Sequence, residues 1–491
     1  MELSTVLTWA LGILIAIDLT LRLVALFVVP RNRTPASGTA WLMTVTFFPL
    51  IGFLLFLAIG TNHLPRQRRE KQREAALRIN GKSPTLHVET ALGSAPDWFV
   101  EVIDLNQRLG GMPLVGGNQV RIMHETLESY DELIAEIDRA RERVHVQFYI
   151  LAYDETTAPV FAALRRAVQR GVTVRILIDY WASRRTRGFA ATKRELDAIG
   201  AKWAYTLPFE PMRGHMQRPD LRNHRKIVTV DGEVGFTGSL NLVHPSYHKP
   251  KAIRRGMRWI DLMARFEGPV VAELDAVFAT DWFIEVGEEI IDESLQKRFA
   301  RNVHELRGPV QCQVVPSGPG YASESNLQMF LALLYHARHS VEIVSPYFVP
   351  NDAMLYALSN IRARGINVDL YVSEMADQFL VHHAQCSYYE QLLRMGVRIW
   401  RYRAPSLLHT KYVVVDDQVS ALGSSNMDMR SFTLNMEVTV LLYGDATANV
   451  LQGIARLYRG SSVQLTLTEW STRRWYKRMA DNICRLTSAL Q

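Results

Sequence analysis

The chain contains the stretch Asn223-His224-Arg225-Lys226, followed by Asp231 and then by Gly238-Ser239-Leu240-Asn241. The same spacing recurs later as His409-Thr410-Lys411, then Asp416, then Gly423-Ser424-Ser425-Asn426. A single H-x-K is common by chance, but two copies of H-x-K-x4-D-x6-G-S-x-N indicate a duplication. The repeat predicts two imidazoles, two ammonium groups and several small hydrogen-bond donors around one site.

Each copy has the pattern of a β-hairpin. His224 and Lys226 are two positions apart, so on a strand both side chains lie on one face. β-Branched residues follow, and we expect Asp231 to form the turn rather than to touch substrate. The returning strand then presents Ser239 and Asn241 as phosphate-binding donors. The equivalent residues of the second copy are His409, Lys411, Asp416, Ser424 and Asn426.

Segments with a shared plan surround the two motifs. In the first half, a strand pattern at 144–149 leads to a helical stretch at 161–170, a glycine, and a strand pattern at 172–178. The second half repeats this order at 341–344, 354–364 and 366–372. The order predicts βαβ units, a largely parallel sheet and an α/β fold.

Composition sets broad limits on the class of protein. A chain of 491 residues is too long for one ordinary hydrophobic core, so we expect two or more domains. A composition of 48% hydrophobic and 21% charged residues is typical of a globular protein with some membrane segments. A net charge of +7 suits phospholipid surfaces or nucleic acid. Cys312, Cys386 and Cys484 form no C-x-x-C pair, which favours a reducing compartment.

Two apolar stretches, 4–29 and 39–60, open the chain. Each has the roughly 20 residues that cross a bilayer as a helix. A signal peptide is the alternative for the first stretch, but Glu2 stands in place of a basic start and the stretch is too long. Asp18 and Arg22 are four positions apart and can pair within it.

Charges beside these stretches predict their orientation. The second stretch is followed by Glu70 among the basic residues Arg66, Arg68, Arg69, Lys71 and Arg73. By the positive-inside rule we expect a multi-pass protein of the cell (inner or plasma) membrane with its large C-terminal part, which carries both motifs, in the cytoplasm. The linker 30–38 would lie outside, although it holds Arg31 and Arg33.

Imidazole and ammonium groups together suit attack on a phosphodiester. Lysine neutralises the phosphoryl oxygens, while serine and asparagine donate further hydrogen bonds. One histidine attacks, and the other protonates the leaving alkoxide and then deprotonates the acceptor alcohol. We expect two lysines in place of a metal, and no cofactor. Asp261 and Glu437 follow the two motifs and are candidates to orient the imidazoles from the second shell, or are simply exposed strand acids.

The duplicated motif resembles that of the phospholipase D superfamily and, more closely, that of the bacterial cardiolipin synthases. Similar segments also lie at 346–350, 387–397, 423–432 and 435–437, so the resemblance covers nearly the whole chain. It implies two pseudo-twofold-related phospholipase D-like α/β halves with mixed β-sheets, preceded by two transmembrane helices. Thr410 departs from the small residue usual between histidine and lysine, but it should face away from His409.

The resemblance implies transfer of a phosphatidyl group from one phosphatidylglycerol to another, which releases glycerol and forms cardiolipin through a phosphatidyl-histidine intermediate. The implied catalytic set is His224, Lys226, Asp231, His409, Lys411 and Asp416. His224 is the expected nucleophile and His409 the acid and base, or the reverse. The expected partners are phosphatidylglycerol and anionic membrane lipids, with no nucleic acid. The oligomeric state stays open.

These expectations divide the chain into 4–29 and 39–60 as transmembrane helices, 61–105 as a basic juxtamembrane connector, and 106–305 and 306–491 as two phospholipase D-like halves. A membrane-bound phospholipase D, or a phosphatidyltransferase with a different acceptor alcohol, would use the same residues. A nuclease of the superfamily fits the charge but needs no membrane anchor.

Several basic or aromatic segments fit a lipid surface or an ordinary solvated face equally well. They are 184–194, 251–258, the loop 208–215 and the C-terminal tail 470–478. For the tail, an interfacial amphipathic helix and a helix packed on the body are both open.

Overall fold

A computed structural model describes residues 3–31, 33, 35–60, 64–82, 97–210, 212, 217–290, 308–321 and 324–488. The chain forms two compact units. One consists of residues 1–65 with 209–221, and the other of residues 66–208 with 222–491. The loop expected at 208–215 therefore belongs largely to the N-terminal unit, although residues 211 and 213–216 lie outside the described residues.

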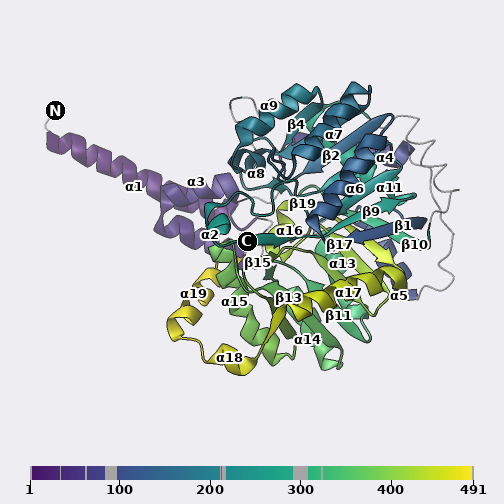
Figure 1. Cartoon of the computed structure of the whole chain (residues 1–491). Coiled ribbons are helices and arrows are strands. Elements are labelled where there is room, and N and C mark those ends of the chain that lie inside the picture. The colour runs from purple at the N-terminus through teal and green to yellow at the C-terminus, as the bar shows by residue number, and fades with distance from the viewer. Residues whose placement is uncertain are drawn as a thin grey trace. The chain divides into compact units, whose positions relative to one another are not determined.

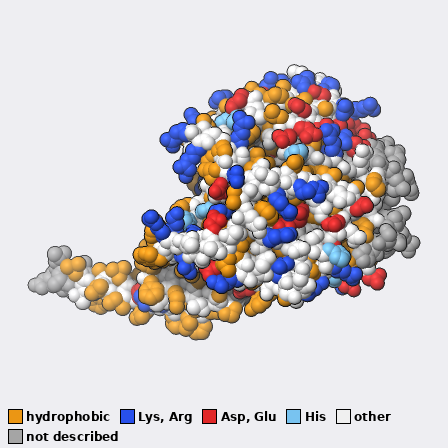
Figure 2. Space-filling view, turned by 60° about the horizontal axis from the view of Figure 1, so that its bottom comes forward, with side chains coloured by type: hydrophobic (Ala, Val, Ile, Leu, Met, Phe, Trp, Pro, Cys, Tyr) orange, Lys and Arg blue, Asp and Glu red, His pale blue; other side chains and the backbone are white. Residues whose placement is uncertain are grey.

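The N-terminal unit begins with α1 (Leu3–Val28), followed by α2 (Pro35–Phe47) and α3 (Pro49–Ile59). At about 1.5 Å per residue, the 26 residues of α1 are long enough to cross a bilayer. Leu7–Val28 is the one described segment that is long and apolar enough to do so. Figure 2 shows apolar side chains covering these helices, and Asp18 pairs with Arg22 at 2.9 Å, as their spacing predicts.

The second apolar stretch is not a single helix. Pro49 starts α3 after Phe48, whose φ of −134° and ψ of 72° leave the helical region. The chain then folds back, because the rings of Trp41 and Phe56 lie 5.5 Å apart, whereas 15 residues of continuous helix would separate them by about 22 Å. A Cβ on Gly52 would lie only 2.7 Å from the Thr44 carbonyl oxygen, so this contact requires glycine.

The expectation of a second spanning helix over 39–60 is therefore not confirmed. With 13 and 11 residues, α2 and α3 are each shorter than the roughly 20 residues that a crossing needs.

The larger unit, residues 66–208 with 222–491, is built on one continuous mixed sheet (Figure 1). The strands of its first half are β1 (Val115–Met123), β2 (Arg143–Phe148), β3 (Thr173–Asp179), β4 (Lys202–Thr206), β6 (Ile227–Val230), β7 (Val234–Gly238) and β9 (Met263–Glu267). Those of its second half are β10 (Val310–Ser317), β11 (Ser340–Val344), β13 (Asn367–Ser373), β14 (Arg398–Tyr402), β16 (Tyr412–Val415), β17 (Val419–Gly423), β19 (Asn435–Tyr443) and β20 (Ser462–Leu465).

The strand order reveals the duplication. From the central antiparallel pair β1–β10, one half continues β9-β7-β6-β2-β3-β4 and the other β19-β17-β16-β11-β13-β14. Along this order of strands, only β2–β3–β4 and β11–β13–β14 pair in parallel, so the sheet is mixed rather than largely parallel. The expected hairpins form as β6–β7 and β16–β17. The expected boundary between the halves, near 305, lies outside the described residues.

Helices cover both faces of the sheet because strand residues alternate between them. Val144 and Val146 face the core beneath α6 (Thr126–Arg139) and α7 (Ala158–Gln169), whereas His145 and Gln147 bind Asp275 and Asp281 of α11 (Val270–Val286). The helices of the first half are α6 (Thr126–Arg139), α7 (Ala158–Gln169), α8 (Tyr180–Arg185), α9 (Phe189–Ile199), α10 (Pro250–Arg254) and α11 (Val270–Val286). Those of the second are α13 (Ser325–His336), α14 (Asp352–Ala363), α15 (Phe379–Arg394), α16 (Met429–Thr433), α17 (Asp445–Gly460), α18 (Leu467–Ser471) and α19 (Trp475–Arg485).

The segment expected as a connector contains two packed helices, α4 (Arg66–Lys82) and α5 (Asp97–Arg108). α4 packs on α11, where Arg68 pairs with Glu285. α5 buries Trp98 and Phe99 in the core of the second half. Residues before the first half thus complete the core of the second.

Candidate active site

Both motifs begin beside a strand from the opposite half. The short strands concerned are β5 (Arg222–Asn223), β8 (Arg258–Ile260) and β15 (Ser406–Leu408). β5 pairs in parallel with β19, and the N–H of His224 donates to the Met436 carbonyl at 2.8 Å. β15 pairs in parallel with β8, and the N–H of His409 donates to the Ile260 carbonyl at 2.8 Å. Each His-x-Lys lies between such a strand and its hairpin, rather than on one continuous strand.

His224 contacts Glu437, which comes from the second half. Its Nδ1 lies 3.0 and 2.9 Å from the two carboxylate oxygens. Burial lowers the pKa of His224 to about 4, although Glu437 acts to raise it, so the imidazole is neutral near pH 7. A carboxylate only accepts hydrogen bonds, so Nδ1 carries the proton and Nε2 keeps its lone pair.

His409 contacts Asp261, which comes from the first half. Its Nδ1 lies 2.7 Å from Asp261 Oδ1. Burial acts to raise the pKa of Asp261, but His409 and Lys411 outweigh it, and the carboxyl stays ionised below its usual range. Burial and the neighbouring Lys411 lower the pKa of His409. The sequence suggested both acids as partners, but not that each would bind the histidine of the other half.

The two lysines complete one shared site. Lys226 and Lys411 are almost fully buried, and each Nζ donates to the carbonyl of its own histidine at 2.6 Å. Burial lowers the pKa of Lys411 to about 8 and that of Lys226 well below its usual value. Each lysine also lowers the pKa of the other half's histidine. The four groups therefore act on one another across the two halves.

The serines of both motifs bind the acids. Ser239 donates its hydroxyl proton to Asp261 at 2.7 Å, and Ser424 donates to Glu437 at 2.5 Å. Each hydroxyl oxygen also accepts a backbone N–H, from Leu262 at 2.9 Å and from Val438 at 3.0 Å. Each serine's proton thus fixes the acid that orients a histidine. Phosphate binding by the two serines, which the sequence suggested, stays a prediction.

The two asparagines differ in their partners. Asn241 Oδ1 accepts the Ile150 N–H at 3.2 Å, and its Nδ2 donates to the Tyr247 hydroxyl at 2.9 Å. Asn426 is buried, and its Oδ1 has no hydrogen-bond partner among the described residues. A carboxamide keeps two N–H donors, so both residues retain the capacity to bind a phosphoryl oxygen.

Asp231 and Asp416 hold the hairpins. Asp231 accepts the N–H groups of 141–143 at 2.8 to 2.9 Å. Asp416 accepts those of 338–340 at 2.6 to 3.0 Å. Both have φ of 53°, as the first position of a tight hairpin turn requires. Neither makes a hydrogen bond to a histidine or lysine of the motifs among the described residues, so their contacts are those of turn residues.

Aromatic rings distinguish the two histidines. The Tyr149 ring lies edge-on to His224 with centroids 4.7 Å apart, and Lys226 Nζ lies 5.4 Å from the same ring. On the other side, the centroid of Tyr247 lies 6.2 Å from that of His409. The duplicated site is therefore not symmetric.

Sequence reasoning missed a buried ion pair behind the first motif. Arg225 is fully buried and binds both oxygens of Asp281 on α11, at 2.7 and 2.8 Å. Its Nε donates to the Glu437 carbonyl at 3.0 Å, which fixes the strand that carries the acid. The equivalent Thr410 donates to the Ile260 carbonyl at 3.2 Å. The signal was an arginine between the histidine and lysine of a motif expected to form the site, where a buried charge requires a partner.

One group of side chains among the described residues could hold a metal ion. Asp154, Glu155 and His248 place ligand atoms within 4.8 Å of one another. Asp154 already accepts the N–H groups of Thr156, Thr157 and His244, as a loop clamp does. The histidines of the two motifs are not members of this group.

Comparison with known proteins gives a consistent family. The model described as "Cardiolipin synthase, PLD-like domain" matches residues 133–282 and 330–456, and "Phospholipase_D-nuclease N-terminal" matches 20–60. "Cardiolipin synthase A" of Proteus mirabilis (strain HI4320) is 33% identical over 94% of this chain and 95% of its own length. The chain belongs to the cardiolipin synthase family. Its members are phosphatidyltransferases of the phospholipase D superfamily, and the chain is such an enzyme.

Other relatives agree with membership of the cardiolipin synthase family. "Cardiolipin synthase A" of Erwinia tasmaniensis is 31% identical over 99% of both chains. The crystal structure of phosphatidylserine synthase from Haemophilus influenzae Rd KW20 has a TM-score of 0.56 at 15% identity, covering 79% of this chain and 97% of that one. The latter likeness shows the fold alone. As a family member with an apolar N-terminal helix, the chain is membrane-associated.

Proposed function

We propose that the chain makes cardiolipin from two molecules of phosphatidylglycerol by a two-step transfer on His224. The observation that carries the proposal is the crossed pairing of His224 with Glu437 and of His409 with Asp261. Because each half orients the other half's histidine, both imidazoles serve one phosphodiester. The catalytic and phosphate-binding roles that the sequence predicts for the residues of the two motifs are part of this proposal.

In the first step, His224 Nε2 attacks the phosphorus and the bond to the departing glycerol oxygen breaks. His409, in the imidazolium form that the ionised Asp261 stabilises, gives its Nε2 proton to that oxygen, and glycerol leaves. Lys226 and Lys411 neutralise the phosphoryl oxygens as charge shifts onto them. Glu437 stabilises the positive charge that develops on the phosphorylated His224 ring.

In the second step, the neutral His409 accepts the proton of a glycerol hydroxyl on the second phosphatidylglycerol. The resulting oxygen attacks phosphorus, the P–N bond to His224 breaks, and cardiolipin forms. Asp261 stabilises the imidazolium of His409 in both steps. The low pKa of His224 supports this residue as the nucleophile, because its ring is neutral throughout the physiological pH range.

We also propose a specific placement in the membrane. α1 crosses once, whereas α2 and α3 enter and leave from the same face, since Trp41 of α2 packs on Phe56 of α3. Arg31 and Arg33 then lie on the same side as the basic residues that follow residue 65, and the positive-inside rule places that side, with the catalytic unit, in the cytoplasm. A multi-pass arrangement would require α2 and α3 to open into one helix.

The reaction is tested with the purified full chain in vesicles of phosphatidylglycerol containing EDTA. Cardiolipin and glycerol in equal amounts are the expected products, and His224→Ala should abolish both. Phosphatidic acid alone would identify a hydrolase, another head group would identify a different acceptor alcohol, and no lipid turnover would favour a nuclease.

A further inference from the structure

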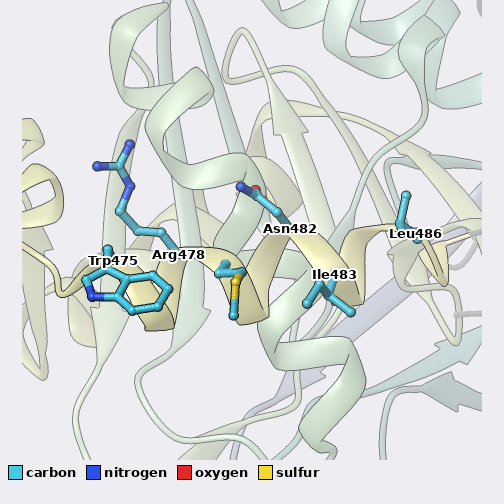
Figure 3. Close-up of a pocket in the computed structure, with 6 residues that line it drawn as sticks. Trp475, Arg478, Asn482, Ile483 and Leu486 are labelled. Carbon is cyan, nitrogen blue, oxygen red and sulfur yellow. The ribbon is translucent and has the colours of Figure 1, made fainter.

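The C-terminal helix α19 exposes an unusually apolar face. Trp475, Met479, Ile483 and Leu486 follow one another at helical spacing and are 72%, 50%, 56% and 83% exposed. With Arg478 and Asn482 they line an open groove along the helix (Figure 3). Folded proteins seldom leave such a continuous apolar stripe in water unless it binds something.

Contacts on the opposite side of α19 fix this stripe outward. Asp481 and Cys484 are buried against α15. Asp481 binds His383 of α15 at 2.6 Å and Arg473 at 2.7 Å. The helix thus packs on the body through one side and presents an apolar face on the other.

A second exposed apolar pair lies next to this helix. Phe379 and Leu380 begin α15 and are 69% and 51% exposed. The Phe379 ring lies 4.3 Å from His383, the residue that binds Asp481 of α19. The α19 stripe and this pair, which we call the α15–α19 face, therefore share one region of the catalytic unit.

The α15–α19 face adjoins the rim of the active site. Gln378, directly before Phe379, donates to the Tyr347 hydroxyl at 3.1 Å, and Asp377 pairs with Lys249 at 2.8 Å. Lys249 lies 6.0 Å from the ring of Tyr247, which in turn flanks His409. Few residues separate the exposed apolar side chains from the catalytic histidine.

Charge decides which partner fits this face. Exposed cations flank the stripe at Arg474, Lys477 and Arg478, while the acid on the helix, Asp481, is buried and paired. Apolar side chains with tryptophan on one face and cations beside them match a bilayer of anionic lipid. The geometry points to the α15–α19 face as a contact with the anionic membrane surface, separate from the N-terminal helices, that brings substrate lipid to the site.

The first test introduces charge into the face. Met479→Asp with Ile483→Asp should reduce transfer in vesicles of long-chain phosphatidylglycerol at least tenfold. Turnover of dihexanoyl phosphatidylglycerol, dissolved below its micelle concentration, should stay unchanged, because that substrate needs no surface. Val450→Asp with Leu457→Asp on α17 is the matched control, since these residues are 48% and 58% exposed. Vesicle turnover by the variant equal to that of wild type, or an equal loss of turnover with both substrates, would overturn the proposal.

A second test does not depend on activity, and so separates this proposal from the proposed reaction. The full chain is placed in nanodiscs that contain brominated phosphatidylglycerol, whose bromine atoms quench nearby indoles. Wild type should lose more fluorescence than Trp475→Phe. Equal quenching would refute membrane contact. A smaller particle mass in detergent for Ile483→Asp would instead assign the face to a second copy of the chain.

Discussion

The crossed pairing of His224 with Glu437 and of His409 with Asp261 is here called the crossed relay. Replacing Glu437 by glutamine removes one charge from this relay and little else. The glutamine oxygen can still accept from His224 Nδ1, which now lies 2.9 Å from Glu437 Oε2. Since His224 and Lys226 hold the pKa of Glu437 below its usual range against the effect of burial, the native carboxyl is ionised at pH 7. The substitution therefore converts a charge-assisted hydrogen bond into a neutral one.

The substitution raises the activation free energy of the step that places positive charge on His224. A unit charge pair about 4 Å apart, at an effective dielectric constant of about 20, interacts by about 4 kcal/mol. Part of this remains in the dipole of the amide, so we expect a loss of about 3 to 4 kcal/mol. At 1.36 kcal/mol for each factor of ten, kcat falls roughly 200- to 1000-fold.

The assay is initial rate of cardiolipin formation in saturating phosphatidylglycerol, with thermal unfolding measured alongside. Glu342→Gln is the control, because Glu342 is a mostly buried strand residue whose carboxylate pairs with Arg459 rather than with a histidine of the motifs. A Glu437→Gln variant that keeps kcat within threefold of wild type would refute the relay. So would an equal fall in Glu342→Gln.

Three further outcomes follow from the site and the N-terminal helices. With a phosphatidyl ester of p-nitrophenol, which needs no protonation to leave, His409→Ala should still release one equivalent of p-nitrophenolate per enzyme in a burst, and His224→Ala none; the reverse result would exchange their roles. kcat/KM should decline as pH rises, first as His409, whose pKa is lowered, loses the proton that it donates, and again through about 8 as Lys411 loses its proton; the absence of a second decline up to pH 10 in folded enzyme would contradict the role of Lys411 as a cation. In intact cells an impermeant maleimide should label Ser4→Cys but not Ala36→Cys, with wild type as the blank; labelling of Ala36→Cys alone would favour two crossings.

Local sequence patterns predicted the parts of the fold that depend on neighbours in the chain. Asp231-Gly232 fixes a tight turn because both positions adopt positive φ, at 53° and 67°. The strands on either side then pair as the hairpin β6–β7. Pro49 was also a visible signal, since proline rarely continues a helix, but unbroken apolar composition on both sides outweighed it.

Contacts between distant segments could not be read from the sequence. Nothing near Asp261 or Glu437 in the chain indicates which histidine it binds, because that choice depends on how β5 meets β19 and how β15 meets β8. The hydrogen bonds from the Ser239 and Ser424 hydroxyls to these acids could not be predicted for the same reason. Residues 61–105 were expected only as a connector, and tertiary packing alone reveals that Trp98 and Phe99 complete the core of the second half.

The crossed relay also explains why a duplicated motif can act only as a pair. In one half alone, His224 would lack the acid that holds its proton on Nδ1, and Asp261 would be a buried carboxylate without the histidine that offsets its desolvation. The backbone repeats this dependence, since each histidine N–H needs a carbonyl from the opposite half. Docking of the halves therefore fixes the tautomer of His224, balances the buried charges and forms the nucleophile in one event. One half without the other would lack all three, so we expect it to be inactive.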